Sequence, residues 1–382
     1  MMTLPDLQLH IRTLATLEPT ESPVISCYLD LTRPEVEQRS FLGSRLAALR
    51  QSQTPDVSLA YHNAGWQIAD YLEHQLSAEA AGLALFARGG EQPFFLPLQF
   101  GVPLPNWLAV HQTPNLYHLV ELKDTYHRYV LVILTRRIAR ILEINLGSVT
   151  EELWSCRPEL RERVGSGWTR EQYRHHREQQ TAKYIEEKIA VLNRLMKAGG
   201  HTHLVLAGDP ALTTRLKEAL PRPLAAKLVD VMEATVHGDT TAVVAATVAR
   251  FVELEARAEL RMVEEWQRGL HHGDLAVAGT EETLRVLHRQ QVDVVLLDSA
   301  FATATGWSCP ACGAVTSSRA APASCPECRQ DRLRAVNLRD EMVRLAERQG
   351  GRVEVVAGSE VLQKLGGVGC LLRYAAPEQY LG

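Results

Sequence analysis

Short apolar runs, set between helical patterns and turns, are the feature that most restricts the fold of this 382-residue chain. Tyr129–Leu134 reads YVLVIL, residues 292–298 read VDVVLLD, and residues 352–356 read RVEVV. Runs this short and rich in β-branched residues are typical of strands, Tyr129–Leu134 is apolar enough to be buried, and helical patterns alternate with the runs. The pattern therefore predicts an α/β protein.

The middle of the chain shows the clearest order of elements. Tyr129–Leu134 is predicted to be a buried strand, Arg136-Arg137 a hairpin turn, and Ile138–Ile144 the returning strand. A long helix runs to about Ala198, where Gly199-Gly200 ends it, and THLVLAGDPAL then reads as strand, turn and helix start. This order, β-β-loop-α-β-α, predicts an α/β domain over residues 125–238.

The segments on both sides also mix helices and strands. A chain of this length is too long to fold around a single hydrophobic core. We expect three domains, at residues 1–124, 125–238 and 239–382. In the first, strands are predicted at Pro23–Leu31, in AGLALFA and in PFFLPL, and helices at Glu35–Arg50 and Leu59–Leu76. In the third, helices near Thr240–Leu270, Glu281–Arg289 and Leu338–Gln349 alternate with strands, which predicts an α/β/α sandwich.

Four of the seven cysteines form two CxxC pairs in CPACGAVTSSRAAPASCPEC. They are Cys309, Cys312, Cys325 and Cys328. Each CxxC turn presents two thiolates to one tetrahedral ion, so two pairs complete an all-thiolate site for structural Zn²⁺. Redox-active CxxC pairs are the competing interpretation. With zinc, residues 307–330 would form a zinc-ribbon insertion in the C-terminal domain, with no open coordination position for catalysis.

A cationic stretch at residues 157–177 contrasts with the net charge of −4 for the whole chain. Arg170, Arg174 and Arg177 fall on one helical face, because their spacing is i, i+4 and i+7. The same face continues as an apolar stripe of Ile185, Ile189, Leu192 and Met196. The start of this helix is therefore predicted to project into water or towards a polyanion, and a merely solvated charged face is the alternative.

Several other functions lack a sequence signal. The chain has no P-loop, dinucleotide-binding glycine pattern, GxSxG elbow or HExxH motif. Ser166 is flanked by glycines but has no assignable base. No apolar stretch approaches the roughly 20 residues that span a bilayer, and the N-terminal residues lack the apolar core of a signal peptide. Cys27, Cys156 and Cys370 are isolated in the sequence, which is a poor pattern for disulfides. These features together predict a cytoplasmic protein that does not bind membranes.

KLGGVGCLLRY at Lys364–Tyr374 resembles the end of the archaeal and eukaryotic class-1 release factors and of Pelota. In that family a Gly-Gly-x-Gly turn leads into an LRY strand. LVLAGDPAL and EETLRVLHRQQVDVVLLDS resemble the middle and C-terminal domains of the same family, whose archaeal members carry a similar paired-CxxC insertion. The resemblance covers roughly residues 125–382 and implies release-factor-like middle and C-terminal α/β domains.

The resemblance also identifies the loop before the long helix. In release factors this loop carries Gly-Gly-Gln, whose glutamine helps to position water at the peptidyl-transferase centre. Here the corresponding residues are Gly165-Ser166-Gly167-Trp168, and the glutamine is missing. Pelota and the Balon-type hibernation factors share the architecture without that glutamine. Residues 1–124 match the family's decoding domain poorly and contain no stop-codon-reading motif.

The resemblance therefore implies a ribosome-binding factor that occupies the A site of idle or stalled ribosomes, in hibernation or rescue, without peptide release. Two alternatives stay open: a peptidyl-tRNA hydrolase that uses the Gly165–Gly167 loop, and an RNA- or protein-binding module outside the ribosome. Expected partners are rRNA, tRNA and a translational GTPase such as elongation factor Tu. No catalytic residue is predicted. The residues expected to contact rRNA or tRNA are Arg161, Arg163, Gly165, Ser166, Gly167, Trp168, Arg170, Arg174, His175 and Arg177.

Overall fold

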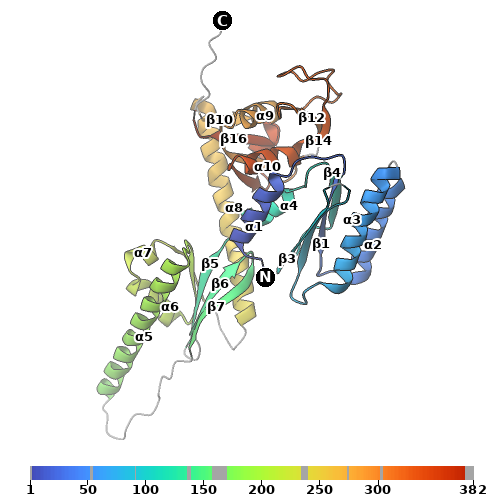
Figure 1. Ribbon diagram of the computed structural model, residues 1–382. Coiled ribbons are helices and arrows are strands. Elements are labelled where there is room, and N and C mark those ends of the chain that lie inside the picture. Colours follow the sequence, from blue (N-terminus) through green and yellow to red (C-terminus); the bar gives the residue numbers. More distant parts are fainter. Residues whose placement is uncertain are drawn as a thin grey trace. The chain divides into compact units, whose positions relative to one another are not determined.

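The structure is a computed structural model that describes residues 2–51, 55–90, 92–135, 139–156, 170–233, 240–272, 275–301 and 304–374. The chain divides into two compact units (Figure 1). Unit 1 combines Met1–Thr125 with Glu253–Gly382, and unit 2 is Tyr126–Val252. Helices and strands of both units confirm the predicted α/β class.

Unit 2 is built on a five-stranded mixed sheet with the strand order β7-β6-β5-β8-β9. Neighbouring strands β5, β6 and β7 are antiparallel, whereas β8 and β9 run parallel to β5. The predicted hairpin is confirmed in its two strands, and its turn at Arg136-Arg137 lies outside the described residues. The strands are β5 (Tyr129–Leu134), β6 (Ala139–Asn145), β7 (Ser148–Cys156), β8 (Leu204–Gly208) and β9 (Leu228–Glu233).

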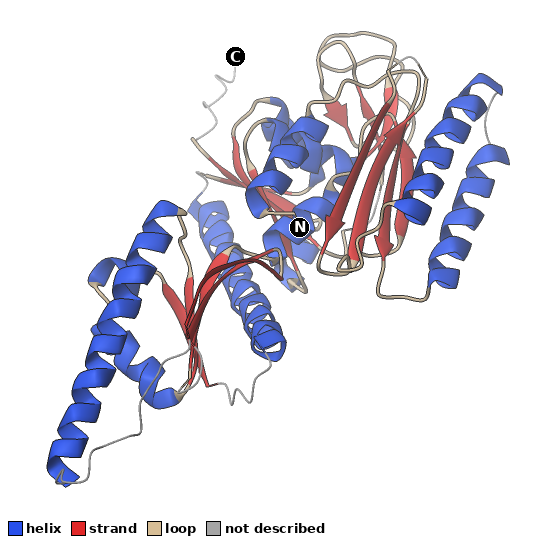
Figure 2. Cartoon of the chain, turned by 60° about the horizontal axis from the view of Figure 1, so that its bottom comes forward, coloured by secondary structure: helices blue, strands red, loops and turns tan. Residues whose placement is uncertain are grey.

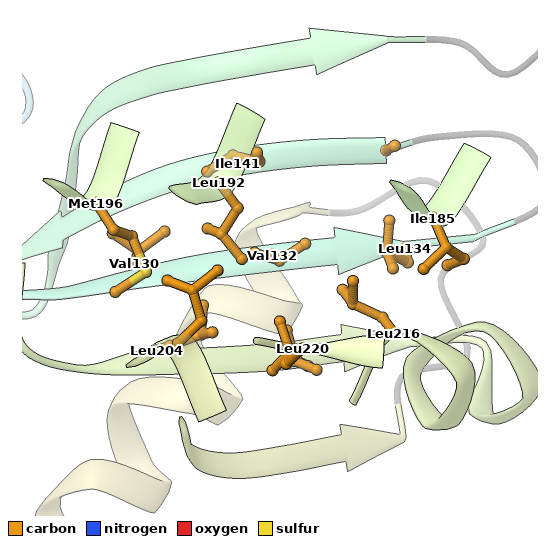
Figure 3. Close-up of a cluster of buried hydrophobic side chains, with 13 residues drawn as sticks. Val130, Val132, Leu134, Ile141, Ile185, Leu192, Met196, Leu204, Leu216 and Leu220 are labelled. Carbon is orange, nitrogen blue, oxygen red and sulfur yellow. The ribbon is translucent and has the colours of Figure 1, made fainter. Parts of the chain in front are cut away.

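Helices cover both faces of this sheet. Alternate residues of β5 point to opposite faces, so β5 contributes apolar side chains to two separate clusters. On one face Val130, Val132 and Leu134 pack against α5 and α6, as Figure 3 shows. On the other face Tyr129, Leu131 and Ile133 pack against the first part of α8. The helices are α5 (Arg170–Ala198), α6 (Pro210–Ala219), α7 (Arg222–Ala225) and α8 (Thr240–His272), which continues into unit 1.

The first 125 residues of unit 1 contain an antiparallel four-stranded sheet with the order β3-β2-β1-β4. Helices α2 and α3 cover one face, where Leu42 and Ile68 contact Ile25 and Leu85. Helices α1 and α4 contact each other. The elements are α1 (Leu4–Ala15), β1 (Val24–Asp30), α2 (Glu35–Gln51), α3 (Pro55–His74), β2 (Gly82–Arg88), β3 (Phe94–Phe100), β4 (Trp107–His111) and α4 (Tyr117–Thr125).

The C-terminal part of unit 1 has a second four-stranded sheet, in the order β10-β16-β11-β15. Trp266 of α8 and Leu362 of α11 pack on one face against Val294 and Leu296, while α9 and α10 contact the sheet as a further layer. The elements are β10 (Ala276–Ala278), α9 (Thr280–His288), β11 (Val292–Asp298), α10 (Leu338–Arg348), β15 (Arg352–Val356), α11 (Glu360–Lys364) and β16 (Val368–Leu372).

A small antiparallel sheet lies within the C-terminal part, where the sequence predicts an insertion. Its strands are β12 (Thr305–Ser308), β13 (Val315–Thr316) and β14 (Arg334–Asn337), in the order β13-β12-β14. Both CxxC turns lie between these strands, Cys309–Cys312 after β12 and Cys325–Cys328 before β14. We call residues 305–337 the cysteine ribbon.

The first and last parts of the chain are joined by specific contacts within unit 1. Helix α1 contacts α10, and α4 contacts α10 and β15. Lys123 of α4 forms an ion pair with Glu347 of α10, and Arg344 donates to the carbonyl oxygen of Ala15 at 3.2 Å. These contacts explain why residues 1–125 and 253–382 form one compact unit although they are far apart in sequence.

Several elements are additions to the sequence expectation, among them α1, β4, α4, the edge strand β7, α7, β9 and β10. The segment between β6 and the long helix is predicted to be a loop, but Ser148–Cys156 within it form β7. Within the described residues, none of the helices combines the length and apolar character that crossing a bilayer requires.

Candidate functional site

The four cysteine thiols of the ribbon converge on one point. The Sγ atoms of Cys309 and Cys328 are 3.5 Å apart, those of Cys312 and Cys325 are 3.6 Å apart, and all four lie within 4.8 Å of one another. Four sulfurs around one tetrahedral ion with bonds of about 2.3 Å are separated by roughly 3.8 Å. A disulfide would instead need about 2.05 Å. The spacing thus fits one four-coordinate ion and no disulfide.

Both CxxC turns use the same backbone geometry. In the first, Gly313 donates its N–H to the carbonyl of Cys309 at 2.8 Å, and Cys309 donates to the carbonyl of Ala314. In the second, Arg329 donates to Cys325 at 2.9 Å, and Cys325 donates to the carbonyl of Gln330. The residue that follows each CxxC has a positive φ, 76° at Gly313 and 61° at Arg329. This repeated turn directs both thiols of a pair to the same side.

The electrostatics of the cluster also favour a cation. Burial acts to raise the pKa of the Cys309 thiol, but backbone N–H groups of Cys312 and Ala311 outweigh it and lower the value to about 7. Burial and the neighbouring thiols raise the pKa of Cys312 to about 12. The Cys309 thiolate is therefore stabilised, while the neighbouring thiols disfavour ionisation of Cys312. A divalent cation bound between them would stabilise both thiolates.

The second predicted site, the basic start of α5, lies in unit 2. The helix begins at Arg170 and its buried stripe is confirmed, since Ile185, Leu192 and Met196 are at most 4% exposed. The first of these lies 15 residues after Arg170, which corresponds to about 22 Å of helix. The side chains described before residue 180 are all exposed: Glu171, His175, Glu178 and Gln179. Figure 2 shows α5 extending past the strands of its sheet.

The predicted RNA-binding residues are described only in part. Arg170, Arg174 and Arg177 lie on α5 at the predicted i, i+4 and i+7 spacing, and their side chains lie outside the description. His175 is exposed, and its Nε2 lies 2.9 Å from Nε2 of Gln179. Nucleic-acid contact at these positions stays a prediction. Six further residues lie outside the described part of the chain: Arg161, Arg163, Gly165, Ser166, Gly167 and Trp168.

Sequence reasoning missed a group of three carboxylates in unit 1. One oxygen each of Asp124, Glu255 and Glu354 lies within 4.8 Å of the others. Asp124 also accepts the N–H of Val355 at 2.7 Å. Burial, followed by the charge of Glu354, raises the pKa of Asp124 to about 9. These residues come from α4, α8 and β15, and no local spacing in the sequence could have indicated their proximity.

Residues 114–252 match the family model described as bacterial archaeo-eukaryotic release factor family 10. The matched segment contains the whole of unit 2, with α5 and its basic start. The chain is therefore a relative of the archaeo-eukaryotic release factor class, and the family relationship predicted from the sequence is confirmed. No curated protein matches the sequence.

Three solved structures illustrate the range of similar chains. The archaeal translation termination factor aRF1 is 19% identical, with 98% of this chain and 99% of that chain covered and a TM-score of 0.29. Archaeoglobus fulgidus Pelota is 14% identical, with coverages of 98% and 93% and a TM-score of 0.38. A structure of ribosome-bound archaeal Pelota and ABCE1 is 17% identical, with coverages of 98% and 95% and a TM-score of 0.41.

Proposed function

We propose that this protein is a ribosome-binding factor that occupies the A site of idle or stalled ribosomes, in hibernation or rescue, without releasing peptide. The observation that carries the proposal is α5. Its buried stripe begins about 22 Å beyond Arg170, so the first buried anchor of the helix on its sheet comes well after the basic first turns. A rigid helix with a cationic end suits a deep cavity walled by RNA phosphates.

The residue content of the loop before α5 supports binding without hydrolysis. Release requires a group that orients water against an ester, and such positioning contributes several kcal/mol of barrier lowering. The loop contains Gly165, Ser166, Gly167 and Trp168, and has no amide side chain. Gln172 follows inside α5, later in the sequence than the loop. Hydrolysis through the Ser166 hydroxyl is the competing function.

We further propose that the cysteine ribbon holds one structural Zn²⁺. Four protein thiols fill a tetrahedral shell, so the ion has no open position for substrate or water. The identical backbone turns at Cys309 and Cys325 support this assignment, because both present two thiols in one direction. The zinc would hold the two CxxC turns of the ribbon together and take no part in the chemistry. Delivery to the ribosome by a GTPase such as elongation factor Tu stays a prediction from the family resemblance.

The decisive test combines binding and release on one ribosome preparation. Ribosomes carrying labelled formyl-methionyl-tRNA in the P site and an empty A site are mixed with excess protein and pelleted through sucrose. We expect saturable co-sedimentation, loss of binding when an A-site tRNA is added first, and no free formyl-methionine above the factor-free control. A release factor on a stop-codon complex serves as the positive control for hydrolysis.

Each contrary result identifies one of the alternatives. Formyl-methionine release that Ser166→Ala abolishes would establish the peptidyl-tRNA hydrolase and overturn our proposal. Absence of binding to ribosomes in every state, with retained binding to free RNA or another protein, would place the protein outside the ribosome. Binding that A-site tRNA does not compete would refute A-site occupancy.

A further inference from the structure

A polar cavity in unit 1 lies where the first and last parts of the chain meet the cysteine ribbon. Its volume is about 60 Å³, several times the roughly 10–15 Å³ that one buried water molecule requires. The walls come from the loop after β4, from Ser308 and Pro310 at the first CxxC turn, from β14, and from the first turns of α10. Neither the four-thiol cluster nor α5 contributes to it.

Asn115 presents a buried side-chain amide to this cavity. The residue is 1% exposed, and among the described residues neither Oδ1 nor Nδ2 of its amide forms a well-formed hydrogen bond. Its backbone is held firmly, because its N–H donates to Oγ of Ser26 at 3.0 Å and its carbonyl accepts from the Tyr28 hydroxyl at 2.6 Å. An amide fixed in this way and left unpaired costs free energy that a ligand could recover.

Asp340 of α10 faces the same cavity and is 8% exposed. Neither of its carboxylate oxygens accepts a well-formed hydrogen bond from the part of the chain that the structure describes. Arg339 forms a long ion pair with it, with Nε 3.6 Å from Oδ1, and its guanidinium lies over the Tyr117 ring at 3.9 Å. Burial raises the pKa of the Asp340 carboxyl, although the charge of Arg339 and the polar interaction of the neighbouring Asn115 side chain with the carboxylate act against it. Within the described residues, the carboxylate therefore has polar neighbours but no well-formed hydrogen bond to stabilise it.

The remaining charges of the lining decide which ligand would fit. Glu341 and Arg344 neutralise each other through two hydrogen bonds of 2.8 and 2.6 Å. Arg334 of β14 also lines the cavity, and none of the described residues forms an ion pair with it. The cavity thus offers one carboxylate without a well-formed hydrogen bond, one guanidinium without a counter-ion among the described residues, and an amide that can both donate and accept.

We propose that this cavity binds a small zwitterion, of the size and kind of a free amino acid. Its ammonium group would donate to Asp340 and to Oδ1 of Asn115, and its carboxylate would accept from Nδ2 of Asn115 and from Arg334. The volume admits solutes of a few non-hydrogen atoms and excludes nucleotides. Because the walls come from three segments of unit 1, bound ligand would hold the ribbon and α10 to the loop after β4.

In the full-length, zinc-loaded protein, Asp340→Asn should stabilise the fold and weaken ligand binding. Removing an uncompensated buried carboxylate should raise the melting temperature of the ligand-free protein, by roughly 2–4 °C. The same change should weaken zwitterion binding about tenfold or more, because a charge-assisted hydrogen bond is lost. A purely structural aspartate would show the opposite sign in the first measurement. Asp331→Asn, an exposed position on the ribbon, is the matched control.

Calorimetric titration with glycine, L-alanine and L-serine tests binding, and ethylamine and acetate serve as probes that carry only one of the two charges. We expect the amino acids to bind in the millimolar range or tighter, the single-charge probes to bind more weakly, and Arg334→Met to reduce amino-acid binding while Arg332→Met leaves it unchanged. No heat at millimolar ligand would mean that the cavity holds only water. Equal binding of ethylamine or acetate, or unchanged binding by Asp340→Asn, would also refute the proposal.

Discussion

Nε2 of His201 lies 2.6 Å from Oε2 of Glu143, and both residues are buried in unit 2. Glu143 is on β6, and His201 follows the Gly199-Gly200 turn at the end of α5. Arg128 and Asn145 also donate to the same carboxylate. The helix whose first turns we assign to RNA contact is thus tied at its other end to the sheet by one buried carboxylate.

Glu143→Gln should therefore loosen the end of α5 and change the acid sensitivity of unit 2. Burial alone would raise the pKa of Glu143, but hydrogen bonds from Arg128, His201 and Asn145 lower it to about 2. Since the folded pKa is below the unfolded value near 4.5, the stabilisation is complete above pH 4.5 and is lost as the pH falls towards 2. We expect the variant to be less stable at pH 7 by on the order of 3 kcal/mol.

Native-state hydrogen exchange of the β6 and β8 amides measures this effect locally, which avoids the assumption that the whole chain unfolds in one step. Glu152→Gln is the control, because Glu152 is 43% exposed in a 3.7 Å pair with Arg140 and should contribute less than about 1 kcal/mol. Equal exchange rates in the two variants at pH 7 would show that the buried pair does not hold α5.

Purified protein should contain about one Zn²⁺ per chain, because the ribbon presents four thiols around one point. Elemental analysis after extensive dialysis measures the content. The double variant Cys309→Ser/Cys312→Ser should lose the metal, and Cys156→Ser should retain it. Acid should release the ion, since thiolates must be deprotonated to bind it. Folded wild-type protein that is free of metal and has these four cysteines in disulfides would contradict the assignment.

The triple variant Arg170→Ala/Arg174→Ala/Arg177→Ala should bind ribosomes more weakly and with less dependence on salt. Losing three phosphate contacts should flatten the log–log slope of affinity against salt by roughly two to three units. Lys183→Ala/Arg194→Ala/Lys197→Ala removes the same charge from exposed positions later in α5 and should change the slope little. Identical slopes for wild type and the first variant would show that these arginines only form a solvated charged face and do not contact phosphates.

Gly369 of β16 should not tolerate alanine. A Cβ atom at this position would lie 2.5 Å from Cζ2 of Trp266, which is fully buried and donates to the carbonyl of Val277 at 2.9 Å. Forcing the indole aside should destabilise unit 1 by about 1–3 kcal/mol. Gly43→Ala in α2 meets nothing within 4 Å and should instead be neutral or stabilising. Thermal unfolding of both variants checks the contrast.

Local patterns predicted most strands and helices correctly. The buried runs of β5, β11 and β15 are too apolar for a loop and too short for a helix, and the stripe of α5 requires burial. Strand β7 was missed because its sequence SVTEELWSC carries exposed Glu151 and Glu152 at a sheet edge, so it lacks an apolar run. Helix α1 had a readable signal, with Thr3 as N-cap and Leu7, Ile11 and Leu14 on one face.

Candidate sites built from residues close in the sequence could be predicted, and those built from residues far apart in the sequence could not. Two CxxC turns bring their thiols together through local backbone geometry, so the metal cluster could be predicted from spacing alone. Asn115 and Asp340 come from opposite parts of the chain, and only the packing of unit 1 brings them to one cavity. The tie between Glu143 and His201 likewise depends on how α5 lies on its sheet. Side chains that tertiary packing brings together leave no period or motif in a sequence.

The discontinuity of unit 1 has a consequence for how the protein is made. Synthesis proceeds from the N-terminus, so the contiguous unit 2 can complete its fold while the chain still grows. Helix α1 must wait for α10, its contact in unit 1, until the ribosome has added the whole of residues 126–252 and more. At about 5–20 residues per second, that delay exceeds roughly 6–25 s. During this interval the apolar face of Leu7, Ile11 and Leu14 lacks part of its cover, and the nascent chain is open to chaperones.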